Sequence, residues 1–166
     1  MSKLKTVEDL LVEEIKDLYS AETQLVKALP KMAKAASDPE LRAGFQKHLK
    51  ETTIHVERLT KVAELLDASP KGKTCRAMKG LIEEGSEVIA EDAVPPIKDL
   101  ALIVAAQKVE HYEIAGYGSA RTLAETLSHR EVVKLLQTTL DEEGITDKTL
   151  TELSMKLIPV AVEMKA

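Results

Sequence analysis

Apolar residues recur every three or four positions along four long stretches of the chain, as they do on the buried face of a helix. The first stretch shows this most clearly, with Leu11, Ile15, Leu18, Leu25 and Leu29 in one stripe. The stripes and the breaks between them predict long helices over about residues 5–36, 39–67, 95–127 and 129–162, and a short amphipathic helix over about 74–90. Near the middle of each long stretch, a carboxylate or a histidine interrupts the stripe.

The breaks between these stretches predict how the helices are connected. Asp38 before Pro39 is typical of a helix start, and Ser128 is placed to cap the last helix. The first and third breaks are only a few residues long, so each should join an antiparallel pair of helices. The second connection is long enough to travel the length of a bundle. We therefore predict an all-α fold in a single domain over residues 1–166: a ferritin-like four-helix bundle, with two antiparallel hairpins joined by a long crossover that contains a short extra helix.

Composition is consistent with this fold and excludes several classes of function. Apolar residues make up 44% of the chain but aromatic residues only 2%, which favours an aliphatic core of closely packed helices. A net charge of −5 argues against nucleic-acid binding, which needs a basic surface. The single cysteine, Cys75, rules out an intrachain disulfide and suggests a reducing compartment. Without a signal-like start or a long apolar run, we expect a cytoplasmic protein with no membrane segment.

The helical spacing directs several acids into the core, where they need partners. Burying an ionised carboxylate costs several kcal/mol, against a total stability of about 5–15 kcal/mol. Two divalent cations would offset most of this charge. Oxygen-rich ligation with few imidazoles favours iron, or manganese, over zinc. The five acids are Glu22, Glu51, Glu110, Glu143 and Asp147.

The two predicted hairpins repeat one arrangement of these side chains. The first helix of each hairpin offers a single glutamate, and the second offers a pair at i,i+4, whose members share one face of the helix. The single residues are Glu22 and Glu110, and the pairs are Glu51 with His55 and Glu143 with Asp147. Single glutamates from two helices and paired ligands from two others are typical of a dinuclear carboxylate site.

The spacing within each pair departs from that of known dimetal bundles. There, a histidine usually follows the glutamate by three residues, whereas this chain has Ile54 and Thr146 at those places. His55 and Asp147 lie one residue further on, and we expect them to substitute. The predicted site therefore relies on i,i+4 pairs.

Other side chains near this layer extend the prediction or compete with it. Glu113, three residues after Glu110, is expected as an additional carboxylate ligand. His48 is an alternative nitrogen ligand to His55, and Glu142 is an alternative to Glu143. Tyr19, Tyr112 and Tyr117 also fall close to the acids, where packing is the simpler explanation and a redox role the alternative.

Four strings of the sequence carry a resemblance to a known family. They are DLYSAETQL (17–25), HLKET (48–52), AAQKVEHYEIAGYG (105–118) and TLDEEGITD (139–147). Together they resemble the YciF-like family of ferritin-like proteins, also described as a domain of unknown function. The resemblance implies a ferritin-like bundle with a dimetal centre, a homodimer and an association with bacterial stress responses. It does not imply an established reaction.

Two hypotheses for function follow. In the first, the chain is a ferritin-like protein that binds two metal ions, iron or manganese, and reacts with peroxide or dioxygen; whether it is an enzyme stays open. The alternative is a non-enzymatic stress or structural bundle with a vestigial metal site. A DNA-protecting shell is disfavoured, because the chain is acidic and has no basic tail.

Overall fold

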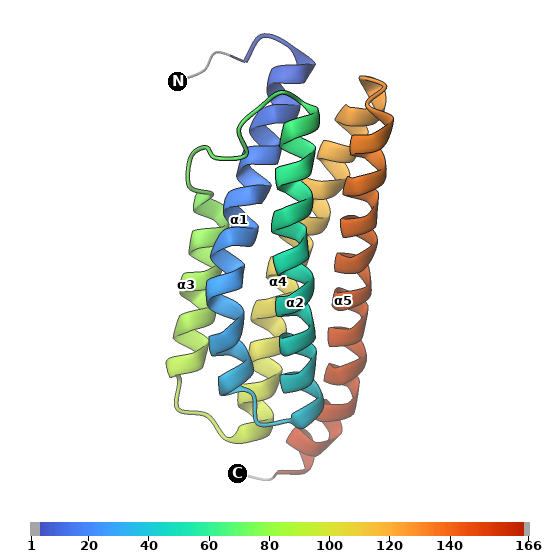
Figure 1. Ribbon diagram of the computed structural model, residues 1–166. Helices are drawn as coiled ribbons and strands as arrows, with labels where there is room; N and C mark the ends of the chain where they lie inside the picture. The colour runs from blue at the N-terminus through green and yellow to red at the C-terminus, as the bar shows by residue number, and fades with distance from the viewer. Residues whose placement is uncertain (1–3, 165–166) are drawn as a thin grey trace.

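The computed structural model describes residues 4–164, which form five helices and no strand (Figure 1). All five helices were predicted, and their ends lie within about two residues of the expected positions. They are α1 (Val7–Ala35), α2 (Pro39–Leu65), α3 (Arg76–Ala90), α4 (Pro95–Thr126) and α5 (Arg130–Glu163).

The helix ends follow local rules at two places and depart from the prediction at a third. Thr6 caps α1 through a reciprocal capping box with Asp9. Asp38 caps α2 as predicted, accepting a hydrogen bond from the Leu41 amide at 2.8 Å. Ser128 does not cap α5. Its φ of 63° places it in the left-handed region, where it turns the chain, and α5 begins two residues later without a side-chain cap.

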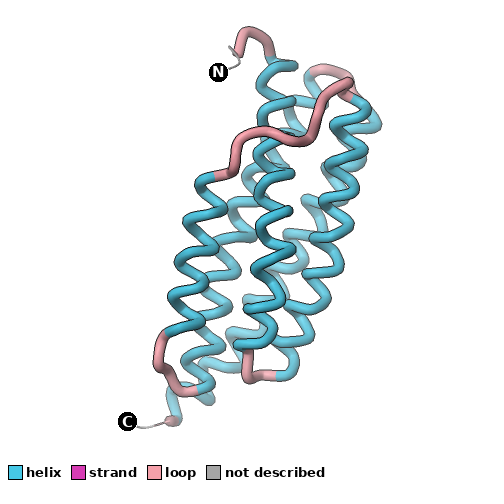
Figure 2. The backbone as a smooth tube through the Cα atoms, turned by 60° about the vertical axis from the view of Figure 1, so that its left-hand side comes forward, coloured by secondary structure: helices cyan, strands magenta, loops and turns pink. Residues whose placement is uncertain are grey.

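The topology is the predicted ferritin-like one. α1 and α2 form one antiparallel hairpin and α4 and α5 the other. The loop after α2 crosses one end of the bundle, and α3 returns along α1 and α4 to the opposite end, where α4 begins (Figure 2). The crossover therefore spans the length of the bundle and leaves α2 and α4 running in the same direction.

A buried aspartate anchors one end of the bundle. Asp99, at the start of α4, is 2% exposed and accepts hydrogen bonds from the backbone amides of Ser37 and Asp38, both at 2.8 Å. These bonds join the α1–α2 turn to the second hairpin. The packing between hairpins is thus fixed by polar contacts as well as by apolar ones.

The apolar core is divided into two clusters. One contains Leu25, Phe45 and Leu102, and the other contains Leu11 and Leu59, each among further aliphatic residues. Along α2, α4 and α5 the two clusters are separated by buried polar residues, and on α1 the buried Glu22 lies where the clusters meet. These polar residues form a layer at mid-height of the bundle, which is where the candidate site lies.

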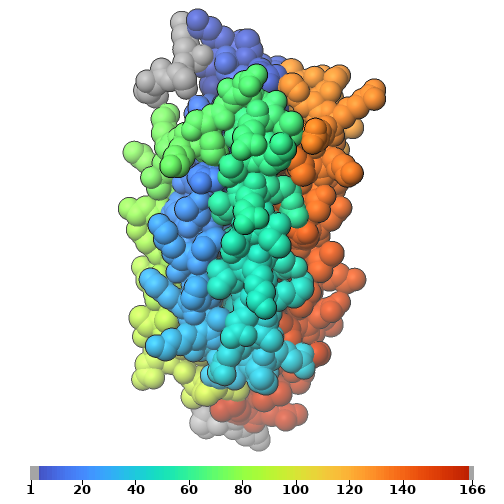
Figure 3. Space-filling view, in the orientation of Figure 1, coloured from blue at the N-terminus to red at the C-terminus, as the bar shows by residue number. Residues whose placement is uncertain are grey.

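The outer surface is built by the same helices. In Figure 3, α1, α2 and α5 lie side by side on the face shown, with α3 at its left edge. None of the helices described within residues 4–164 is both long and apolar enough to cross a membrane.

Candidate metal centre

Six acidic and histidine side chains meet in the polar layer, contributed by all four long helices. α1 provides Glu22, α2 provides His48 and His55, α4 provides Glu110 and Glu113, and α5 provides Glu143. Each of these residues is at most 3% exposed. They interrupt the apolar stripes of their helices, so the packing that buries the neighbouring aliphatic residues also brings these groups together.

Glu143 lies at the centre of this cluster, between the two imidazole rings. Its Oε1 is 2.9 Å from His55 Nδ1, and its Oε2 is 3.9 Å from His48 Nε2. Two groups of ligand atoms result, each with all its atoms within 4.8 Å of one another. One contains Glu22, His55 and Glu143, and the other contains His48, Glu110, Glu113 and Glu143. Glu143 belongs to both groups, so two bound ions could share its carboxylate.

The remaining short distances tie each histidine to a second acid. His55 Nδ1 lies 3.2 Å from Glu22 Oε1, and His48 Nε2 lies 3.1 Å from Glu110 Oε1. The rings themselves are 6.5 Å apart between centroids. Two cations could therefore be held side by side, each by one imidazole nitrogen and by carboxylate oxygens.

The cluster fits a bound cation because its polar atoms lack other partners. Among the described residues, nine buried side-chain nitrogen and oxygen atoms form no hydrogen bond. Eight of them belong to these six residues, and their only close polar contacts are with one another. Buried polar atoms are otherwise paired in more than about 90% of cases, and each unpaired one costs about 1–3 kcal/mol. Unpaired oxygens and imidazole nitrogens that converge in this way match the donor set of iron or manganese. Four carboxylates would balance two divalent ions.

The titration of the cluster is strongly perturbed. Burial lowers the pKa of His48, but the adjacent Glu110 and Glu143 carboxylates outweigh this and raise it to about 9. In the same way, Glu143 and Glu22 overcome the burial of His55 and raise its pKa to about 10. Burial and the neighbouring acids raise the pKa of Glu113 well above its usual value. Without metal, protons therefore balance the charge, and metal binding would have to displace them.

Contacts outside the cluster orient His55. Its Nε2 lies 2.8 Å from Glu142 Oε2, and a carboxylate can only accept, so the Nε2 hydrogen points outward and Nδ1 faces the cluster. Arg58 donates to the same oxygen at 2.8 Å and to Thr139 Oγ1 at 2.6 Å. Such outer contacts fix the tautomer of a metal-binding histidine. Glu142, predicted as an alternative ligand, thus lies beside His55 rather than inside the cluster.

The tyrosines near the layer make different contacts. Tyr117 is buried and donates a hydrogen bond to Glu22 Oε1 at 2.5 Å. Tyr112 instead donates to Asp17 and lies 3.0 Å from the sulfur of Cys75. Tyr19 is partly buried against the apolar cluster of Leu11 and Leu59. Of these three tyrosines, only Tyr117 therefore contacts one of the candidate metal ligands.

Five of the predicted ligands lie together in the cluster, and two do not. Those together are Glu22, His55, Glu110, Glu113 and Glu143. The carboxylate of Glu51 instead pairs with Lys47 at 2.7 Å, and its side chain is 23% exposed. Asp147 accepts from Gln107 at 3.1 Å and lies 3.3 Å from His111 at the edge of the bundle. The structure therefore places Glu51 and Asp147 outside the buried layer.

His48 occupies the place expected for Glu51. It stands in the apolar stripe itself, two helical turns before His55, so the seven-residue spacing puts both rings on one face. The residue of this turn that faces inward is Thr52. Glu51, one position earlier, points about 100° away from it around the helix axis. Membership of the stripe was the signal that favoured His48, and it outweighs the i,i+4 pairing of Glu51 with His55.

Four long helices with a crossover helix and a buried layer of glutamates and histidines define a ferritin-like bundle. The chain belongs to the DUF892 family, whose model, described as a domain of unknown function, matches residues 6–163.

Relatives of known structure support the same fold. Protein YciF of Escherichia coli strain K12 is 47% identical over 164 residues, which cover 98% of this chain and 99% of that protein. The crystal structure of YciF, described as a stress protein, has a TM-score of 0.91 over 94% of this chain and 99% of its own. YcfI from Rhodopseudomonas palustris, described as structural, is 42% identical, with a TM-score of 0.87 over 90% and 95% of the two chains.

A more distant structure shows the fold alone. A protein of Bacillus anthracis strain Ames, described as ferritin-like and diiron-carboxylate, is 17% identical, with a TM-score of 0.70 over 91% of this chain and 99% of that chain.

Proposed function

We propose that the chain binds two metal ions, iron in preference to manganese, at the Glu–His cluster, and that it serves in a bacterial stress response. The observation that carries the proposal is the convergence of eight buried polar atoms from six side chains that have no hydrogen-bond partner outside the cluster. Metal cations can satisfy several carboxylate oxygens and imidazole nitrogens together without adding further buried acceptors. The stress role is suggested by the description of the Escherichia coli relative.

Each residue of the cluster has a distinct part in this proposal. Glu143 would be shared by the two ions, Glu22 and His55 would help to hold one, and Glu110 and His48 would help to hold the other. Glu113 adds a carboxylate beside the second position and offsets its remaining charge. Glu142 holds the Nε2 hydrogen of His55 and thereby keeps Nδ1 directed at the metal.

The site would also control access to the ions. The bound metal would supply redox chemistry toward peroxide or dioxygen. An apolar cluster on each side of the layer limits solvent access along the bundle. Tyr117 donates a hydrogen bond to Glu22, which would keep that carboxylate oriented. We also propose that the protein is cytoplasmic and that it forms a homodimer.

Metal analysis tests the binding directly. Protein purified without chelators and then loaded with iron(II) or manganese(II) should contain about two ions per chain, and anomalous scattering should place them beside Glu143. Glu110→Gln should lower the number of metal ions bound per chain, whereas Glu51→Gln should leave this number unchanged. Glu51 is the matched control, because it carries the same group at the same height but lies outside the cluster. Less than half an ion per chain after loading would refute the proposal.

The non-enzymatic alternative makes a different prediction. If the layer is a vestige, Glu143→Leu should leave metal-dependent melting unchanged, because no ion would be bound. Peroxide consumption by iron-loaded wild type, compared with Glu110→Gln, then separates an enzyme from a simple metal binder. Equal and slow consumption by both proteins would favour the structural role.

A further inference from the structure

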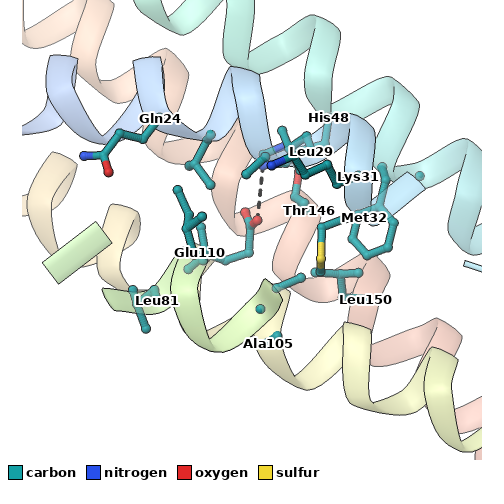
Figure 4. Close-up of a pocket in the computed structure, with 18 of the residues that line it drawn as sticks. Gln24, Leu29, Lys31, Met32, His48, Leu81, Ala105, Glu110, Thr146 and Leu150 are labelled. Atoms are coloured by element: carbon teal, nitrogen blue, oxygen red, sulfur yellow. Dashed lines mark hydrogen bonds and ion pairs between the residues drawn. The ribbon is translucent and has the colours of Figure 1, made fainter. Parts of the chain in front are cut away.

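A cavity of about 270 Å³ lies next to the cluster and opens toward the surface. Its inner end is formed by His48 and Glu110, both buried, and Figure 4 shows the Glu110 carboxylate pointing toward the His48 ring. Its walls are mainly apolar, with Leu29, Met32 and Leu81 among the side chains around it. The crossover helix α3 builds one wall, so the cavity lies between the bundle and α3.

The exposed part of this lining is positively charged. Lys27, Lys31 and Lys47 line the cavity and are exposed, and Glu51 is the only exposed or half-buried acid among the lining residues. Lys47 is paired with Glu51 at 2.7 Å, but within residues 4–164 neither Lys27 nor Lys31 forms an ion pair. A chain with net charge −5 thus presents two free ammonium groups at the mouth of its apolar cavity.

We propose that this cavity binds a medium-chain carboxylate, with the anionic head at Lys27 and Lys31 and the alkyl tail directed toward the metal centre. The apolar walls fit the tail, because burial of each methylene is favourable by transfer from water. The lysines fit the head, because an exposed ion pair costs no desolvation of a buried charge. That the ligand is a substrate of the metal centre rests on the function proposed above, whereas its binding does not.

The volume sets the length of the tail. An engineered apolar cavity of about 150 Å³ takes up benzene, which has six carbons, so a cavity nearly twice as large suits a tail of about eight to ten carbons. A longer tail would have to displace Glu110 or His48 from their contact at 3.1 Å. Octanoate is therefore the probe of choice.

Calorimetry on chelator-treated protein tests the binding apart from any metal. From butanoate to octanoate, the dissociation constant should fall about fourfold for each added methylene. Octylammonium should bind about 10-fold more weakly than octanoate, because the lysines repel its head. In the double variant Lys27→Glu with Lys31→Glu, the affinity for octanoate should fall about 10-fold, whereas the affinity for octan-1-ol should stay unchanged. Equal affinity for octanoate and octylammonium would overturn the assignment of an anion.

A steric variant tests the location. Gly85 of α3 lines the cavity, and an added Cβ there would meet only Met32 Sδ, at 4.0 Å, so Gly85→Leu should place its larger side chain in the cavity. Gly80→Leu is the matched control on the same helix, with nothing within 4 Å of an added Cβ and no place in the lining. Octanoate binding should be lost in Gly85→Leu and retained in Gly80→Leu. If Gly85→Leu fails to fold, Gly44→Leu tests the part of the lining that α2 contributes.

Metal loading separates the two proposals. Octanoate that binds metal-free protein and also shifts the absorption bands of the iron-loaded protein supports both. Octanoate binding by a chain that takes up no iron upholds the cavity ligand but removes its link to a metal centre. Iron uptake with octanoate affinity unchanged by Gly85→Leu refutes the cavity assignment and leaves the metal centre intact.

Discussion

Replacing Glu113 by leucine should make the metal-free protein more stable. Both carboxylate oxygens of Glu113 are buried without a hydrogen-bond partner outside the cluster, and three other glutamates of the cluster surround them. One such unsatisfied group costs about 1–3 kcal/mol, so its removal should raise the free energy of unfolding by about that amount. For a chain of this size, the melting temperature should rise by about 2–12 °C.

The same substitution should have the opposite effect on metal-loaded protein. A ligand at 100 times its dissociation constant stabilises the native state by about 2.7 kcal/mol, and Glu113→Leu should lose much of this gain at the same metal concentration. Urea and thermal unfolding, each with chelator and with added manganese(II), measure both effects.

Two variants control for unrelated causes. Glu113→Gln keeps the size and the unpaired polar atoms, so its metal-free stability should stay near that of wild type. Glu125→Leu changes an exposed glutamate of the same helix and should shift stability by less than about 1 kcal/mol. Metal-free Glu113→Leu that is less stable than wild type would refute the reasoning, because it would show that this carboxylate supports the fold on its own.

Three further predictions concern the same layer and its surroundings. The pKa values of His48 and His55 rise from 6.5 to about 9 and about 10 in the folded state, so both rings stabilise the metal-free protein fully below pH 6.5 and lose this effect as pH rises through those values. Melting temperatures of chelated protein should therefore fall between pH 6.5 and 10, while metal affinity, measured by competition with a chelator, rises. Arg58→Met leaves Glu142 without its cation, so manganese(II) affinity should drop about 10- to 100-fold with unchanged helix content by circular dichroism. The Cys75 thiol is 1% exposed and burial raises its pKa, so it should react with a thiol reagent only as fast as the protein unfolds, and rapid labelling of native protein would contradict this.

The helices and their order could be predicted because the information is local. An apolar stripe marks a helix, Asp38 before Pro39 marks a start, and the length of the second connection distinguishes a ferritin-like crossover from a simple up-and-down bundle. The prediction for Ser128 was wrong because the tight turn before α5 needs a left-handed residue there. The residue type alone could not show that requirement.

Within the site, the periodicity of the sequence predicts the height of the polar layer more reliably than it predicts which side chains of that layer are the ligands. Adjacent residues of a helix differ by about 100° in direction, so a shift of one position separates a buried side chain from a half-exposed one. This is why Glu51 was placed in the predicted set and His48 was only an alternative. The contacts of Glu142 with Arg58 and His55 join residues more than 80 positions apart, and no spacing in the chain could predict them.

The even division of the cluster between the two hairpins has a consequence for biosynthesis. The first hairpin carries three of the six side chains, but Glu143, which both proposed positions share, lies on the last helix. At about 5–20 residues per second, a ribosome needs roughly 2–7 s to proceed from Glu110 to Glu143. A nascent chain therefore passes through an interval in which most donors exist but the shared one does not. On the proposed function, capture of a metal pair would require the completed polypeptide, and a truncated product ending before α5 would bind no such pair.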